Sequence, residues 1–341
     1  RKGALQVRGE ADAYYTSGLE PWAKRLTGVW GQDPGWDPLE TMIEMAHTKC
    51  IQVHAYINVY PIVLFCQPGP ITNPQHLYYR LRDHHGTTSG KLNGLQWNSG
   101  GSVICGSSEY QRGSPASLFL DNHLMSVATD LLNRYPDVDG LHLDHIRYAY
   151  GASCDPVSLC RYYGYEENCG RVLSCPLTSS DYKDWQRAQV NGTVDKFYQL
   201  ITSRQSGLWL SAAVWPFYDS GYNSYFQDPK AWLRDDYIDA VMPMLYSWNQ
   251  NTDPLRFDRW RVYVDEFQSS SAGRYVIPGI GGTAFLSFSE IEARINYARD
   301  VGTKGHAIFS YRYMKQYNYF DDMAAGPYAE PASVPSIPWH G

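Results

Sequence analysis

The sequence predicts an α/β protein with a (β/α)8 barrel, and three observations lead to that fold class. Seven short apolar segments alternate with amphipathic helical segments along the 341 residues, and strands that alternate with helices form a parallel sheet. The apolar segments are rich in β-branched and aromatic residues, which is typical of strands buried on both faces. No G-x-G-x-x-G follows any of them, so a dinucleotide-binding open sheet has no support.

We expect seven strands, at 4–8, 52–60, 140–146, 209–215, 240–246, 275–280 and 306–311. A (β/α)8 barrel needs eight strands. Because the chain opens at Arg1-Lys2 directly into the first of these seven, we expect the first strand and first helix of the barrel to lie upstream of residue 1.

Capping residues mark the starts of the helices between these strands. Asp37-Pro38-Leu39-Glu40 places Asp at the N-cap and Pro at the first helical position. Ser287 with Glu290 is a capping box, and Asp-Pro pairs at 228–229 and 253–254 indicate two more helix starts. Apolar residues at helical spacing form three further faces: Leu39, Met42, Ile43 and Ala46; Leu124, Val127, Leu131 and Tyr135; Val190, Val194, Phe197 and Ile201.

The domain organisation that we predict is one barrel over 1–326, followed by a Pro-rich tail over 327–341. Two long insertions, at about 61–117 and 149–180, interrupt the alternation of strands and helices. Each follows the C-terminal end of a strand, which is the face where barrel enzymes build their sites. We therefore expect the insertions to shape the site.

Composition narrows the class of function. The net charge is −6 with no long basic run, which argues against a nucleic-acid partner. No stretch is apolar enough over sufficient length to span a membrane. The 28 Tyr and 11 Trp suit the packing of aromatic rings on sugar faces, although an aromatic-rich core would explain them equally well.

The seven cysteines indicate disulfides and an oxidising compartment. Four of them, at 154, 160, 169 and 175, have spacings that fit a zinc site poorly. Cys66 and Cys105 bracket a long loop, and Cys50 is expected to be a buried free thiol. Asn191-Gly192-Thr193 is a glycosylation sequon, which with the cysteines suggests a secreted glycoprotein.

Asp144 is the best candidate for a catalytic residue. Asp139-Gly140 turns the chain into a strand, and strand alternation then places His142 and Asp144 on one side. A carboxylate at the mouth of a barrel is costly unless it is hydrogen-bonded or used, and its pKa is open to tuning. The alternative is a structural ion pair; Asp137 and Asp139 are interpreted as turn formers.

Further polar and aromatic residues lie at or after strand ends, as a sugar site requires. Arg8 and Arg147 leave room for an anionic sugar. We predict that the substrate contacts nine residues: Gln6, Arg8, His54, Asn58, His142, Arg147, Trp215, Tyr246 and Tyr311.

Glycoside hydrolysis normally uses two carboxylates, and Asp12 is the first choice for the second because it follows a strand end. Glu10, Glu109 and Asp219 are other loop candidates, and participation by a neighbouring group of the substrate would remove the need for one. The chain has neither the G-x-S-x-G motif of serine hydrolases nor the H-E-x-x-H motif of zinc hydrolases. His142 and His145 point to opposite faces of a strand, which argues against a metal site formed by both. His84-His85 is expected to be solvated in a polar loop. We predict no metal and no cofactor.

Several of these segments resemble the glycosyl-hydrolase-like family ten. The resemblance runs in order over nearly the whole chain and rests on segments 5–9, 12–15, 17–22, 37–39, 53–60, 139–148, 226–228 and 242–246. It implies a (β/α)8 barrel, distantly similar to hydrolase domains that cut amino-sugar polymers of biofilms. The aspartate of the D-G-x-H-x-D motif maps to Asp144, the arginine of Q-V-R to Arg8 and an asparagine of the third strand to Asn58. The family's first strand is missing here, and the Cys-bearing insertion departs from the family pattern.

Together these features predict a secreted glycoside hydrolase acting on a polysaccharide or glycan. The alternative is an inactive extracellular glycan-binding or structural barrel. A glycan is the expected partner, and an oligomer or extracellular assembly is possible.

Overall fold

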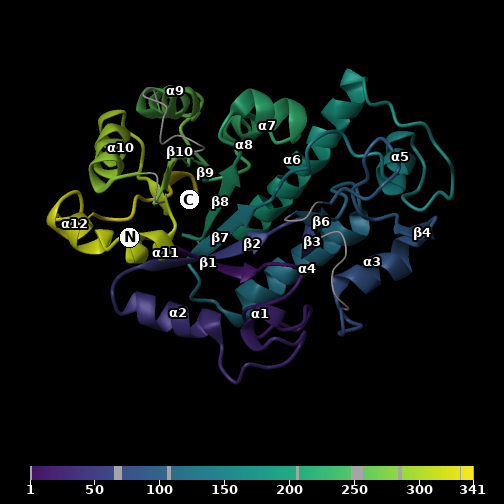
Figure 1. Cartoon of the computed structure of the whole chain (residues 1–341), viewed down its shortest axis with the longest axis horizontal. Helices are drawn as coiled ribbons and strands as arrows, with labels where there is room; N and C mark the ends of the chain where they lie inside the picture. The colour runs from purple at the N-terminus through teal and green to yellow at the C-terminus, as the bar shows by residue number, and fades with distance from the viewer. Residues whose placement is uncertain are drawn as a thin grey trace.

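The computed structural model describes residues 2–64, 71–105, 109–204, 207–246, 256–282, 286–330 and 332–340. Its centre is a six-stranded parallel sheet in the order β1-β2-β7-β8-β9-β10 (Figure 1). The strands are β1 (Lys2–Arg8), β2 (Gln52–Asn58), β7 (Gly140–Asp144), β8 (Trp209–Val214), β9 (Ala240–Pro243) and β10 (Tyr275–Val276). The main strands follow one another in chain order, as barrel strands do.

The seventh predicted strand is β12 (Ala307–Phe309), which pairs in parallel with β11 (Gly279–Gly281). The predicted strand 275–280 is thus divided into β10 and β11, with Pro278, which has no backbone N–H to donate, between them. All seven predicted strands are found, and the predicted α/β class is confirmed. In the described ranges the strands that match the predicted ones form two sheets, one of six strands and one of two.

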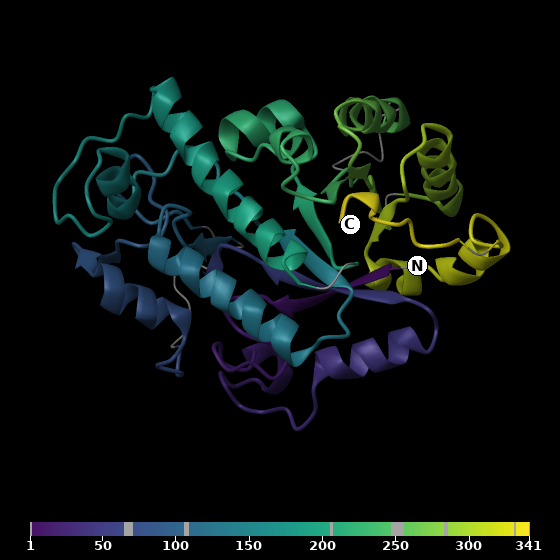
Figure 2. The same cartoon turned by 180° about the vertical axis from the view of Figure 1, so that it is seen from behind.

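The larger helices lie around the outside of the sheet, as Figures 1 and 2 show from opposite sides. They are α2 (Pro38–His47), α4 (Leu118–Arg134), α6 (Ser180–Thr202), α9 (Arg256–Ser269) and α10 (Phe288–Asp300). Shorter helices are α1 (Lys24–Thr27), α7 (Tyr218–Ser224), α8 (Pro229–Arg234), α11 (Tyr311–Gln316) and α12 (Tyr319–Ala325), and η1 (Pro338–His340) is a 3-10 turn.

The predicted helix starts are confirmed where they are described. The Asp37 carboxylate accepts hydrogen bonds of 3.0 Å from the backbone N–H groups of Leu39 and Glu40. The Ser287 backbone N–H donates to the Glu290 carboxylate at 3.1 Å, which completes the capping box. Asp228 caps α8, whereas the pair at 253–254 lies outside the described residues.

Alternation along the strands divides the molecule into an apolar outer layer and a polar interior. Val53, Ala55 and Ile57 of β2 belong to the same buried cluster as residues of α2, α4 and α6. His54 and Tyr56 alternate with them and therefore face the other side of the sheet. The interior row of the sheet carries the polar side chains from which a site can be built.

The two predicted insertions hold the remaining elements. The first contains β3 (Pro61–Leu64) paired antiparallel with β6 (Tyr110–Arg112), α3 (Leu77–His85), and the hairpin of β4 (Thr87–Thr88) and β5 (Lys91–Leu92). The second contains α5 (Pro156–Tyr162). The C-terminal tail packs on the sheet, where Trp339 Nε1 donates to Asp239 at 2.6 Å and the Trp339 ring lies 4.8 Å from that of Tyr275.

Cysteine pairing supports the disulfide expectation, with one correction. Cys154 is bonded to Cys175 and Cys160 to Cys169. Cys105 is also disulfide-bonded, and Cys66 lies outside the described residues. Cys50 is free, as expected, but it is exposed rather than buried, because it lies in the turn that follows α2, with a φ of 53°.

The sequon lies within α6, where its side chains are already engaged. Asn191 accepts a 2.6 Å hydrogen bond from Trp232 Nε1, and Thr193 is buried and donates to Asp121. In the part of the chain that the structure describes, no helix is long and apolar enough to cross a membrane.

Candidate active site

Asp144 ends strand β7 beside Asn58, its register partner on β2. One carboxylate oxygen accepts a 2.6 Å hydrogen bond from the His145 backbone N–H, and the other accepts one from the Tyr56 hydroxyl. The His145 ring nitrogen Nε2 lies 4.0 Å from the second oxygen. The Asp144 side chain keeps 14 % of its surface exposed, so the carboxylate is held firmly and still reachable.

The surroundings of Asp144 favour its ionised form. Burial alone would raise its pKa, but the His145 ring, the Tyr56 hydroxyl and Arg147 together hold the pKa below its usual value. Burial lowers the pKa of His142 to about 4 and that of His145 to about 4. At neutral pH the site therefore contains one carboxylate between two neutral imidazoles.

A cationic and aromatic cluster follows Asp144. The Arg147 guanidinium lies 5.0 Å from the Trp215 ring and 5.1 Å from the Tyr225 ring, and these two rings pack 3.9 Å apart. Arg112, on β6, approaches the His145 ring at 3.5 Å. Contacts of this kind bring the first insertion to the end of β7.

Tyr246 follows strand β9. Its hydroxyl is close enough to Asp144 for the carboxylate to contribute, after burial, to a raised Tyr246 pKa. Its ring stacks on that of Phe309 at 4.9 Å. The predicted residues His142, Arg147, Trp215 and Tyr246 are thus brought near Asp144. Ser211 holds His142 through a 2.9 Å hydrogen bond to Nδ1.

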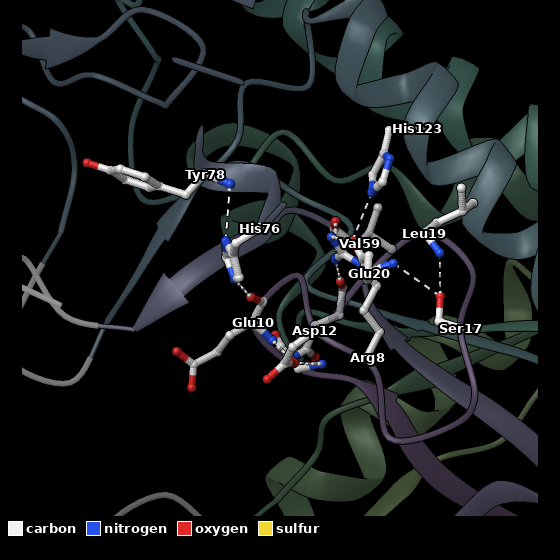
Figure 3. A network of polar contacts seen from close by, with 12 residues as sticks. Arg8, Glu10, Asp12, Ser17, Leu19, Glu20, Val59, His76, Tyr78 and His123 are labelled. Carbon is white, nitrogen blue, oxygen red and sulfur yellow. Dashed lines mark hydrogen bonds and ion pairs between the residues drawn. The ribbon is translucent and has the colours of Figure 1, made fainter. Parts of the chain in front are cut away.

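Arg8 was predicted to contact the substrate, but its side chain is fully buried and stabilises the fold instead (Figure 3). It forms an ion pair of 2.9 Å with Glu20 and donates to the backbone carbonyls of Asn58 and Val59 at 2.5 and 3.1 Å. Glu20 also accepts from His123 at 2.9 Å. With its donors occupied in this way, Arg8 holds the end of β2 and is not presented to a sugar.

The other residues of β1 and β2 that were predicted to contact the substrate lie at different depths below the strand ends. Asn58 is buried and donates to the Gly9 carbonyl at 3.1 Å, so it fixes the turn after β1. Gln6 is the register partner of Tyr56, one row below Asp144. His54 is buried a further row down, with its ring 6.2 Å from that of Trp209, so it lies deep in the interior and not at the mouth.

Tyr311 is not brought to Asp144 by any described contact. It begins helix α11 and does not end a strand, it is 69 % exposed, and its ring lies 5.3 Å from that of Phe320. The strand that precedes it ends at Phe309. Phe309 takes the place at the strand end that the sequence predicted for Tyr311.

Asp12 is buried in the turn after β1 (Figure 3), with 2 % of the residue exposed. One of its oxygens accepts from the backbone N–H groups of Gly9 and Glu10 at 3.2 and 2.8 Å. Burial outweighs these bonds and, with the nearby Glu10 and Glu20 charges, raises the pKa of Asp12 to about 7. Asp12 and Asp144 therefore have pKa values pushed in opposite directions.

The other candidates for a second carboxylate are placed less favourably. Glu10 accepts from the Leu64 backbone N–H at 2.8 Å and faces Arg25 at 3.6 Å. Asp219 is exposed in the first turn of α7. Glu109 pairs with Arg112 at 3.1 Å, but its side chain is 60 % exposed.

Several residues of the cluster were absent from the predicted set. Tyr56 could have been found, because it alternates with His54 and Asn58 along β2. His145 follows Asp144 directly. Arg112 and Tyr110, whose ring lies 5.2 Å from that of His145, carry no sequence signal, because the pairing of β3 with β6 brings them in. Tyr225, which follows α7, carries none either.

One group of potential metal ligands occurs among the described residues, away from Asp144. Ligand atoms of His84, His85 and Glu167 lie within 4.8 Å of one another. Both ring nitrogens of His85 are already hydrogen-bonded, at 2.7 Å to Asn168 and 2.7 Å to Ser117. The sequence placed the pair in a solvated loop, whereas it ends helix α3, where His84 is exposed and His85 is buried.

Comparisons with known proteins agree with this geometry. The family model described as Glycosyl hydrolase-like 10 matches residues 4–270. Glycosyl hydrolase YngK of Bacillus subtilis is 25 % identical over 98 % of this chain and 65 % of its own length. Glycosyl hydrolase DigH of Escherichia coli is 24 % identical over 84 % of this chain and 62 % of its own length. The chain thus spans less than two thirds of these relatives.

Solved structures show the fold. The PgaB (BpsB) glycoside hydrolase domain of Bordetella bronchiseptica superposes with a TM-score of 0.60 at 10 % identity, covering 94 % of this chain and 87 % of that one. The catalytic domain of a β-amylase from Paenibacillus polymyxa gives a TM-score of 0.54 at 11 % identity, covering 92 % and 86 %. The predicted barrel fold is confirmed by this likeness.

Proposed function

Because this chain belongs to the Glycosyl hydrolase-like 10 family, we propose that it hydrolyses a glycosidic bond in a polysaccharide or glycan, with the chemistry centred on Asp144. The observation that carries the proposal is the state of this carboxylate. It is ionised, it is fixed by two hydrogen bonds, and it remains accessible at the C-terminal end of a barrel strand. That is the end at which barrel enzymes carry their catalytic groups.

Asp12 is the proposed partner carboxyl. Two-carboxylate hydrolysis needs one group that keeps its proton near neutral pH and one that has lost it. Asp12, with a pKa of about 7, and Asp144, with a depressed pKa, meet this requirement. Asp12 follows β1 and Asp144 ends β7, and these strands are separated by β2 alone, so their axes lie about 10 Å apart.

In this arrangement Asp12 protonates the leaving oxygen, and Asp144 activates a water molecule or attacks the sugar carbon. The Tyr56 hydroxyl and the His145 backbone N–H orient Asp144. The paired rings of Trp215 and Tyr225, and those of Tyr246 and Phe309, offer apolar surfaces for sugar rings.

Secretion is part of the proposal. Cys154–Cys175 and Cys160–Cys169 are formed disulfides, and such bonds persist in oxidising compartments. Extracellular or periplasmic glycans would then be the substrates within reach.

The direct test is a hydrolysis screen of purified protein on a polysaccharide panel, read by release of reducing ends and by product mass. The second candidate function is glycan binding without turnover, and the burial of Asp12 favours it, because an acid must reach its substrate. Measured binding with no bond cleavage on the panel would support this second function and contradict the first.

Substituting Asp12 separates a catalytic role from a structural one. Asparagine keeps an oxygen that accepts the Gly9 and Glu10 N–H bonds but cannot supply a proton, so Asp12→Asn should lower kcat by about 10²-fold or more with little loss of stability. In the wild type, kcat/KM should fall as pH rises through about 7, because Asp12 loses its proton there. An active asparagine variant with the same alkaline limb would show that Asp12 only forms the turn.

A further inference from the structure

Arg147 is a buried charge that nothing in the described ranges neutralises at close range. The residue is 8 % exposed, and its guanidinium has no hydrogen bond or ion pair within the described chain. The nitrogen Nε is buried without a partner. Because burying an unpaired cation is costly, a guanidinium in this state points to an anion that the site receives from outside.

Arg112 makes the same region more positive. It is 4 % exposed, and its Nε is likewise buried without a partner. Its one carboxylate partner in the described chain is Glu109, whose charge is largely hydrated. After burial, the nearness of Arg112 is the main cause that lowers the pKa of Arg147 to about 10, so Arg147 stays charged at neutral pH.

The Arg147 guanidinium lies within cation–π distance of the Trp215 and Tyr225 rings. A cation–π contact engages the charge and requires none of the N–H donors. The N–H donors at the edge form a fork that matches the two oxygens of a carboxylate. Asp144 lies close enough to feel the charge of Arg147, so an anion bound there would sit beside the bond that is cleaved.

We propose that Arg147, supported by Arg112, binds a carboxylate on the sugar next to the scissile bond, and that the substrate is therefore an acidic glycan. This inference rests on the proposed function, because it places the carboxylate relative to Asp144. It extends that function by naming the substrate class and the residue that selects it.

The test compares matched sugars on the Asp144→Asn protein, which separates binding from turnover. The probes are glucuronate, galacturonate and N-acetylmuramate, each beside its carboxyl-free counterpart, namely glucose, galactose and N-acetylglucosamine. Dissociation constants come from NMR titration. At least one acidic sugar should bind about 10- to 100-fold more tightly than its counterpart. Equal affinities throughout, or no binding by any acidic sugar, would overturn the inference.

Two substitutions assign the preference to Arg147. Arg147→Met keeps an apolar side chain beside the rings but removes the charge, and should reduce the ratio of acidic-sugar to neutral-sugar affinity to about one. Arg171→Met is the matched control, since Arg171 stacks on Tyr165 at 4.4 Å in the disulfide-bonded loop, and it should leave the preference intact. A preference that survives in Arg147→Met contradicts the assignment, as does tighter binding of glucose 6-sulfate than of glucuronate.

The outcomes also separate this inference from the proposed function. Wild-type hydrolysis of neutral and acidic glycans at equal rates would leave the hydrolase proposal standing and remove the acidic substrate. Selective binding of acidic sugars with no hydrolysis by wild-type protein would do the reverse.

Discussion

Replacing Asp144 by asparagine is expected to lower the rate of glycan hydrolysis by about 10³-fold while the protein stays folded. Asparagine has the same shape, and its oxygen can still accept from Tyr56 or from the His145 backbone N–H. It cannot act as a base or a nucleophile, which are the roles that the depressed pKa of Asp144 supports. Reducing-end release on a glycan that the wild type cleaves measures the effect, and circular dichroism checks the fold.

Asp137→Asn is the matched control for this variant. Asp137 is exposed, lies just before β7 and undergoes the same chemical change, so its activity should equal that of the wild type. Unchanged hydrolysis by Asp144→Asn would remove Asp144 from the mechanism. Equal losses in the two variants would instead indicate a general disturbance of this segment.

The backbone organisation was predictable because it follows from local rules. Strand β7 was identified from alternation, and the same alternation correctly put His142 and Asp144 on one side of the sheet. Helix α2 followed from the N-cap Asp37, and α10 from its capping box. These signals involve residues within a few positions of each other, so one sequence contains them completely.

The composition of the site was less predictable, because it depends on contacts between distant segments. Arg8 ends a strand, as a substrate-binding residue would, and nothing local shows that Glu20 and His123 enclose it. Arg112 reaches His145 only because β6 pairs with β3. The strand predicted to end at Tyr311 ends two residues earlier, at Phe309, and Tyr311 begins a helix instead.

The Arg8 network also determines how the first turn of the site is held. Arg8 links Glu20 to the carbonyls that end β2, and Asn58 at that end reaches Gly9. Gly9 is one of the two residues whose backbone N–H groups hold Asp12. The buried Arg8–Glu20 ion pair therefore helps to position Asp12 through the backbone of the turn, without contacting a substrate.

Breaking this ion pair should be the most destabilising single change near the site. Glu20→Gln leaves the Arg8 guanidinium buried without its counter-charge, and loss of one partner of a buried pair costs about 3–5 kcal/mol in the free energy of unfolding. Urea denaturation at pH 7 measures this cost. Glu44→Gln, on the exposed side of α2, is the control and should change stability by less than about 0.5 kcal/mol.

The pH dependence of stability gives an independent check with a definite sign. Burial alone would raise the pKa of Glu20, but Arg8 and His123 outweigh it and lower the pKa to about 2. A carboxylate with a depressed folded-state pKa stabilises the fold above its unfolded pKa and loses that contribution as pH falls through the folded value. The difference in unfolding free energy between wild type and Glu20→Gln should therefore be full above about pH 4.5 and shrink towards pH 2. If the double variant Arg8→Met with Glu20→Leu is as stable as wild type while Glu20→Gln is not, the loss of stability in Glu20→Gln comes from the unpaired buried charge of Arg8. If Glu20→Gln is as stable as wild type, the ion pair does not hold the turn.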